Sequence, residues 1–170
     1  MFCVNSSKVR REFDLNSFTT KVEVLKALDD VEVEAGDAST HLAINELVLS
    51  GFLEDNGARK GHSRIAILLT DNRQSMTPNE TVLAAARAHD SDTDITMITV
   101  GIGKNLNLDE LAAIASQPIC QHFISLNDFK EVDDLKYVVR YRIREGTCDA
   151  CLFLIGLTVI DRLLIRDGQA

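Results

Sequence analysis

The sequence predicts an α/β domain in which a three-layer, Rossmann-like and mostly parallel sheet has helices on both faces. Two nearly continuous apolar runs, at 63–70 and 94–103, have the length and composition of parallel strands buried on both sides. Between them, residues 77–90 begin as a helix should, with Pro78 in the first turn, Glu80 beside it and an alanine-rich body. Strands that alternate with helices in this way form βαβ units.

The segments before residue 63 fit the same alternation. Residues 9–15 alternate between apolar and polar side chains, which predicts a strand. Residues 19–30 are helical in pattern, with Thr19 or Thr20 as the N-cap. A second helical stretch covers 39–57, and its apolar face carries Ile44, Leu47, Val48, Gly51 and Phe52.

Three further elements follow the second apolar run. Residues 107–116 form a short helix capped by Asn107, and residues 121–126 form a third buried strand. Residues 127–145 form the last helix, whose apolar stripe consists of Phe129, Val132, Leu135, Val139 and Ile143. No repeat or low-complexity linker interrupts the series, so the pattern predicts one domain.

Composition excludes several classes of protein. With 170 residues, 45% hydrophobic and 26% charged, the chain is long and apolar enough to bury a core. Its net charge of −8 argues against a nucleic-acid partner, which would require clustered Lys and Arg. The first residues lack the pattern of a signal peptide. The apolar run at 151–160 is well short of the roughly 20 residues of a membrane span.

Two sequence motifs resemble redox, zinc or phosphate-binding sites but lack the full pattern of any of them. Cys148 and Cys151 form a single CxxC, which leaves a redox motif, half of a zinc site or a domain-flanking disulfide as alternatives. The segment TVGIGKN, 99–105, contains two glycines and a lysine, as phosphate loops do. It satisfies neither the Walker spacing nor the dinucleotide spacing, and we therefore interpret it as a turn.

The stretch IAILLTDNRQS, 65–75, contains the strongest candidate site residue. Asp71 comes directly after a predicted strand, where α/β sheets bind their ligands. Asp37, Ser39 and Thr40 precede a predicted helix and offer further oxygen atoms for a divalent cation. In the alternative interpretation, Asp71 forms a turn and Ser39 or Thr40 caps the helix.

An α/β metal-assisted hydrolase centred on Asp71 is the enzymatic alternative. It would need a further carboxylate or histidine within coordination distance of Asp71. No GxSxG motif is present. The four histidines are scattered along the chain at His41, His62, His89 and His122. The residues alone therefore favour a binding module over an enzyme.

The chain resembles the von Willebrand factor type A domains of extracellular-matrix proteins such as matrilins and collagen VI. The resemblance covers about 4–148 and rests on SSKVRREFDL, GDASTHLAI, RIAILLTDNRQS, ITMITVGIG, LDELAAIASQP and HFISLNDFKEVDDL, in the order and spacing of the family. It implies a secreted, non-enzymatic module for protein binding and cell adhesion. Collagens and other matrix glycoproteins would be its partners.

The resemblance also implies where a metal-ion-dependent adhesion site would lie. Asp71 matches the aspartate of the family's TDG motif, although Asn72 replaces the glycine. The position of the family's threonine is Ala38, with Ser39 and Thr40 as neighbouring hydroxyls. The DxSxS motif of the first strand has no counterpart, because the similarity begins at the second strand. We therefore expect an incomplete site without a cofactor, which would take Mg²⁺ only if missing N-terminal residues completed it.

The same comparison divides the chain into a type A domain lacking its first strand, 1–148, and an apolar tail, 149–170. In the family, the first strand lies between those matching 9–15 and 65–70. Residues 152–160 have the length and composition of a buried parallel strand. We hypothesise that this segment fills the vacant position in the sheet.

Overall fold

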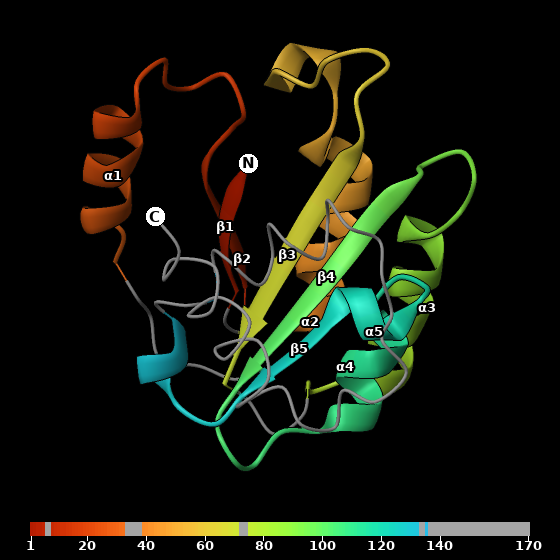
Figure 1. The fold of residues 1–170 in the computed structure, drawn as a ribbon. Coiled ribbons are helices and arrows are strands. Elements are labelled where there is room, and N and C mark those ends of the chain that lie inside the picture. Colours follow the sequence, from red (N-terminus) through yellow and green to blue (C-terminus); the bar gives the residue numbers. More distant parts are fainter. Residues whose placement is uncertain (6–7, 33–38, 72–74, 133–134, 136–170) are drawn as a thin grey trace, which may run out of the picture.

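The computed structural model describes residues 1–5, 8–32, 39–71, 75–132 and 135, and these form an α/β fold (Figure 1). Its main sheet is parallel and has the order β3 (Arg64–Thr70), β4 (Ile95–Ile102) and β5 (Phe123–Leu126). A separate antiparallel pair consists of β1 (Phe2–Asn5) and β2 (Val9–Phe13). The predicted fold class, a mostly parallel sheet combined with helices, is confirmed.

The register of the main sheet defines its two faces. Ile67 lies opposite Ile98, and Leu69 lies opposite Val100. Because side chains alternate along a strand, these four residues share one face, while Ala66 and Met97 share the other. Each face has its own hydrophobic cluster.

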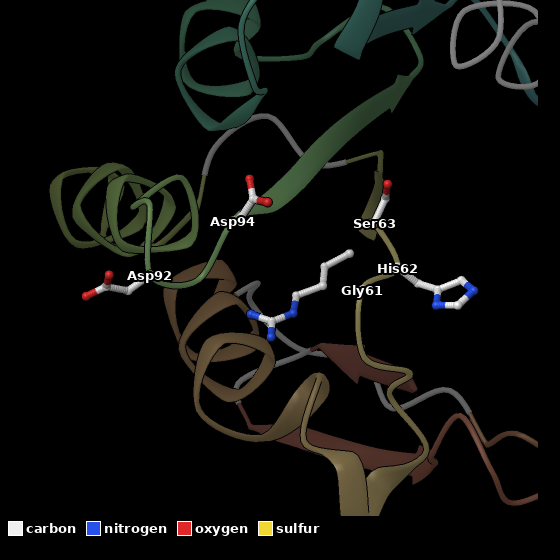
Figure 2. A pocket seen from close by; sticks show the side chains of 6 residues that line it. Gly61, His62, Ser63, Asp92 and Asp94 are labelled. Atoms are coloured by element: carbon white, nitrogen blue, oxygen red, sulfur yellow. The ribbon is translucent and has the colours of Figure 1, made fainter.

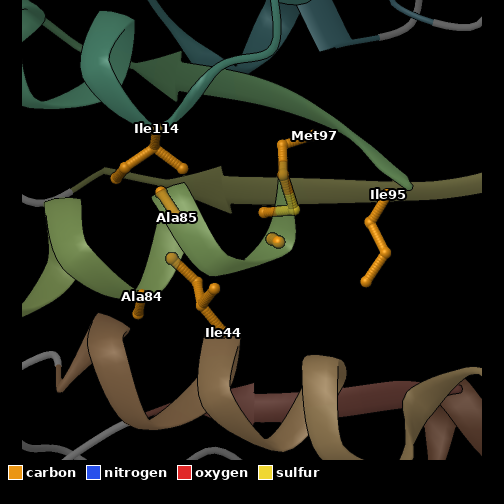
Figure 3. Packing of buried hydrophobic residues seen from close by; sticks show 7 residues of the cluster. Ile44, Ala84, Ala85, Ile95, Met97 and Ile114 are labelled. Atoms are coloured by element: carbon orange, nitrogen blue, oxygen red, sulfur yellow. The ribbon is translucent and has the colours of Figure 1, made fainter. Parts of the chain in front are cut away.

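Three helices cover the face that carries Ala66 and Met97. They are α2 (Thr40–Glu46), α3 (Pro78–Ala88) and α4 (Leu108–Ile114). Figure 3 shows how their side chains meet those of β4. The cluster contains Ile44, Ala84, Ala85, Ala88, Ile95, Met97 and Ile114. A π-helical turn, Leu47–Gly51, continues α2, and Leu47, Val48 and Phe52 pack against this cluster as their helical spacing predicted.

The second face is buried over β4 and β5. Its cluster contains Ile98, Val100, Ile102, Ile124 and Leu126, with Val132 and Leu135 packed against it. These last two residues belong to the predicted stripe of the last helix. Phe129, in the 3-10 turn Phe129–Glu131, is instead mostly exposed, so its assignment to that buried stripe was wrong. Val139 and Ile143 lie outside the described residues.

Helix boundaries follow the predicted caps. Helix α1 (Lys21–Asp29) begins with a capping box in which Thr20 accepts a hydrogen bond from the Glu23 amide and Glu23 accepts one from the Thr20 amide. The Asn107 side chain caps α4 through the Glu110 amide. No helix in the described part of the chain is long and apolar enough to cross a bilayer.

Three features differ from the sequence-based expectations. The third parallel strand begins at Phe123 rather than residue 121, because α5 (Ile119–His122) occupies the preceding residues. Strand β1 was not predicted. Strand β3 was expected to be buried on both faces, yet Ile65, Ile67 and Leu69 are 36%, 47% and 51% exposed.

Candidate functional site

Asp71 lies where the sequence placed it, at the carboxyl end of the main sheet. It follows β3 directly, and it is exposed. Ser39 is the N-cap residue of α2, and Thr40 is the first residue of that helix. Both hydroxyl-bearing residues are buried. The exposed carboxylate and the buried hydroxyls therefore differ in their access to solvent.

The donors in the described part of the chain do not fit a divalent-cation site. Those residues contain no group of three or more His, Cys, Asp and Glu side chains arranged to hold a metal. Among the described residues, the predicted companions of the Asp71 carboxylate are two hydroxyls, whereas Mg²⁺ and Ca²⁺ need six or more oxygen ligands, several of them charged or water. Asp37, Ala38 and Asn72 lie outside the described residues.

A polar cluster at this edge links the starts of α2, α3 and α4. The Thr77 hydroxyl and His41 Nδ1 share a hydrogen bond of 2.7 Å, and His41 Nε2 lies 3.2 Å from a Glu80 carboxylate oxygen. On the α4 side, the buried Glu110 carboxylate accepts hydrogen bonds from the Ser75 amide, at 3.1 Å, and from the Ser75 hydroxyl. These contacts link Ser75 to α4 and Thr77 to α2.

The sequence did not single out Ser75, Thr77 or Glu110. An acidic residue in the first turn of a helix is ordinarily explained by the helix dipole alone, as Glu110 would be. Its burial comes from the packing of the 75–77 segment on α4, which local pattern does not encode. The small polar residues after Asp71 were the available signal, and their partners could not be predicted from spacing.

The two glycines of TVGIGKN were interpreted as a turn, but only Gly103 lies beyond β4, so the interpretation was wrong for Gly101. Gly101 lies within β4, where an added Cβ would come within 2.7 Å of side-chain atoms of both Leu106 and Leu111. Gly103 has a φ of 122°, which favours glycine. Both glycines thus have structural explanations, one in close packing and one in backbone conformation.

A hollow of about 430 Å³ lies at the opposite, amino-terminal end of β3 and β4 (Figure 2). Its lining consists of Gly61, His62, Ser63, Arg64, Asp92 and Asp94. Arg64 donates to the Thr93 carbonyl at 2.7 Å, and His62 Nδ1 lies 3.0 Å from the Lys60 carbonyl. Both side chains thus hydrogen-bond to backbone carbonyl groups of neighbouring segments.

The two cysteines in the described part of the chain are in different states. Cys3 is a free thiol, and burial raises its pKa. A raised pKa lowers the thiolate fraction, which is the reactive form, so Cys3 is not an activated nucleophile. Cys120 is disulfide-bonded. Cys148 and Cys151 lie outside the described residues, and the three interpretations of that CxxC remain predictions.

Comparisons with known proteins define the family. A family model for the von Willebrand factor type A domain matches residues 3–138. The chain is 33% identical to Matrilin-1 of Bos taurus over 162 residues, which is 94% of this chain and 28% of that protein. It is 33% identical to the Collagen alpha-1(XX) chain of Mus musculus over 130 residues, or 76% of this chain and 9% of that one.

Comparison with solved structures gives a similar fold. Proximal thread matrix protein 1 from the mussel byssus, in a structure with a zinc-occupied MIDAS motif, has a TM-score of 0.71 at 25% identity, covering 81% of this chain and 34% of that one. The chain belongs to the von Willebrand factor type A domain family. It spans less than a third of the length of the matrilin and collagen relatives.

Proposed function

We propose that this chain is a non-enzymatic protein-binding module of an extracellular-matrix protein, which recognises collagens or other matrix glycoproteins. The observation that carries this proposal is the similarity to Matrilin-1 across 94% of the chain. The disulfide-bonded Cys120 supports an oxidising compartment outside the cytosol. The net charge of −8 suits a protein partner rather than nucleic acid.

We further propose that binding does not require a divalent cation. Among the donors predicted from the family, the described residues contain one exposed carboxylate, Asp71, and two buried hydroxyl side chains, Ser39 and Thr40. That set is too small to replace the hydration shell of Mg²⁺, an ion that loses water reluctantly. Recognition would then depend on side chains and backbone at the surface rather than on a shared metal ligand.

Calorimetry with Mn²⁺ tests the metal proposal directly. We expect a Kd no tighter than about millimolar for the intact chain, as for an incomplete oxygen cage. The Asp71→Ala variant should behave the same, and Asp109→Ala, which removes an exposed carboxylate on α4, serves as its matched control. Micromolar Mn²⁺ binding that disappears only in Asp71→Ala would overturn the proposal.

Binding to immobilised collagen separates the functional classes. We expect the chain to bind equally in Mn²⁺ and in EDTA, with no hydrolysis of the collagen or of a chromogenic ester during the experiment. Absence of binding to collagen and to a matrix-glycoprotein extract would argue against an adhesive module. Turnover of the ester that is lost in Asp71→Ala would instead support a hydrolase.

A further inference from the structure

The first turn of α3 contains an acceptor triplet for N-linked glycosylation. Asn79, Glu80 and Thr81 follow the required pattern, which is an asparagine, any residue except proline, and then a serine or threonine. Triplets of this kind are modified in chains that enter the secretory pathway. A module of the extracellular matrix follows that pathway, so this triplet would meet the enzyme that uses it.

Asn79 lies on the solvent-facing side of α3. It is the second residue of the helix and is exposed, whereas Thr81, Ala84 and Ala85 face the core and are at most 1% exposed. In the described part of the chain, the Asn79 side chain forms no hydrogen bond or ion pair. A sugar attached to its amide nitrogen therefore displaces no contact of the described fold.

The same side of α3 carries apolar side chains that the fold does not bury. Val82 and Leu83 are 40% and 60% exposed, and Ala86 is exposed as well. They follow Asn79 by three, four and seven positions, so the four residues share the outer face of α3. Side chains on a helix lean toward its start, which brings Val82 and Leu83 over the turn that contains Asn79. Neighbouring apolar side chains on a surface favour association unless something covers them.

The Thr81 hydroxyl, the other group that the triplet requires, is inside the fold. Thr81 is 0% exposed, and its hydroxyl donates to the Thr77 carbonyl at 3.0 Å and lies 2.9 Å from the Ser75 hydroxyl. An enzyme that must contact both the asparagine and the threonine cannot reach them together once α3 has packed. Attachment therefore belongs to the stage before the domain folds.

We propose that Asn79 carries an N-linked oligosaccharide that covers the outer face of α3, an inference that rests on the extracellular location in the proposed function. The donor is an oligosaccharide linked to a lipid diphosphate. A bond forms between Asn79 Nδ2 and the anomeric carbon of the first sugar, while the bond from that carbon to the diphosphate breaks. The lipid diphosphate leaves, one amide proton is released, and nothing is oxidised or reduced. The attached glycan is bulky and hydrated, so it separates Val82 and Leu83 from other molecules.

Site-resolved mass spectrometry tests the attachment. The full chain is expressed behind a secretion signal in mammalian cells, and both the medium and the cell lysate are collected. Enzymatic removal of N-glycans in water enriched in heavy oxygen converts each glycosylated asparagine into a labelled aspartate. We expect the label at Asn79, and Asn79→Gln should lose one glycan, whereas Asn105→Gln, which changes an exposed asparagine outside any triplet, should lose none. An unlabelled Asn79 would overturn the proposal, even if the second triplet, at 5–7, is labelled.

Binding of a fluorescent dye that prefers apolar surfaces tests the covering role. The Asn79→Gln chain should bind more dye than the glycosylated chain, and adding Leu83→Gln should reverse the increase. Enzymatic removal of the glycan from the folded chain gives the same comparison if Asn79→Gln fails to fold. The apolar segment 152–160, whose predicted pairing with the sheet lies outside the described residues, is identical in these chains, so the differences report on α3. Equal dye binding with and without the glycan would overturn the covering role.

Two further experiments separate this inference from its premises. A folded chain purified from bacteria should not be modified by the purified transferase, and its modification would contradict attachment before folding. A chain that binds collagen while Asn79 is unmodified would refute the glycan alone. A glycosylated chain that binds neither collagen nor other matrix glycoproteins would refute the proposed function alone.

Discussion

At the scale of single residues, the Glu110 carboxylate holds Ser75 against the start of α4. Its side chain is buried and accepts two hydrogen bonds from Ser75, one from the amide and one from the hydroxyl. The Ser75 hydroxyl also lies 2.9 Å from that of Thr81. A buried donor that loses its acceptor is still removed from water but no longer makes a hydrogen bond, and this lowers the stability of the fold.

Glu110→Ala should therefore destabilise the domain by about 1–3 kcal/mol, since it leaves the buried Ser75 amide without its acceptor. Urea denaturation measures the change. Asp109→Ala is the matched control, because Asp109 is the exposed neighbour in the same helical turn. It should cost less than about 1 kcal/mol, the usual size of a helix-dipole contribution. Equal effects of the two substitutions would contradict the role of burial.

A second carboxyl group, that of Glu46, makes a contribution to stability that depends on pH. Hydrogen bonds from Arg11 and then Ser50 lower the pKa of the Glu46 carboxyl from its ordinary value of 4.5. The unfolded chain consequently binds this proton at a higher pH than the folded chain does. The stabilisation is fully present above about pH 4.5 and is lost as the pH falls through the lower, folded-state pKa.

Glu46→Gln should therefore flatten the acid side of the stability profile. As the pH falls below about 4.5, the urea midpoint of the unaltered chain should fall more steeply than that of the variant. Glu54→Gln serves as the control, because its ion pair with Lys60 is mostly exposed. A profile for Glu46→Gln as steep as that of the unaltered chain would show that the Arg11 contact is not linked to folding.

At the scale of elements, the contact of α2 with α3 depends on small side chains. Ala84, Ala85 and Ala88 line the buried side of α3 and are at most 1% exposed, whereas Ala86 is exposed. Ile44 of α2 belongs to the same cluster (Figure 3). Closely packed interiors accommodate extra methylene groups only by shifting side chains or backbone.

Ala85→Leu should accordingly destabilise the domain by about 1–3 kcal/mol through overpacking. Ala86→Leu introduces the same residue one position further along the same helix, on its exposed side, and should change stability by no more than about 0.5 kcal/mol. Thermal unfolding of the two variants makes the comparison. A loss of stability in Ala86→Leu as large as that in Ala85→Leu would point to helix propensity rather than packing.

The elements that local rules specify were the ones predicted well. Pro78 and the side chains of Thr20 and Asn107 mark helix starts because capping is a contact between near neighbours. Burial is different, since it depends on partners far apart in the chain. The 63–70 and 94–103 runs look alike in sequence, yet β4 lies between two strands and β3 does not in the described residues.

In the candidate site, too, local features were predictable from the sequence and long-range contacts were not. The position of Asp71 directly after a strand was predicted from the apolar run before it and is confirmed by β3, whereas its role as a metal ligand stays a prediction. The contacts of Ser75 with Glu110 and of Thr77 with His41 join residues 35 and 36 positions apart, and no local spacing encodes them. Strand β1 was missed for a related reason, because four residues are too few for a periodic pattern.

At the scale of the whole molecule, the described residues contain two sheets that are stabilised in different ways. The main sheet is held by clusters on both of its faces. The β1–β2 hairpin has aromatic contacts of its own, with the rings of Phe2 and Phe13 stacked at 5.4 Å and Phe13 edge-on to Phe18 at 5.3 Å. Arg11 connects the hairpin to α2 through Glu46, in a contact that is only partly buried.

This division predicts two levels of opening in native-state hydrogen exchange. The β4 amides at 97–100 lie in the central strand of the main sheet and should exchange only when the whole domain unfolds. The hairpin amides should exchange through a smaller opening, because a partly exposed ion pair and three aromatic rings hold them less firmly than two buried clusters hold β4. Low concentrations of urea should accelerate exchange in β4 and leave the hairpin nearly unaffected, since urea sensitivity scales with the surface exposed. The same opening free energy and urea dependence in both segments would instead show that the hairpin unfolds only with the main sheet.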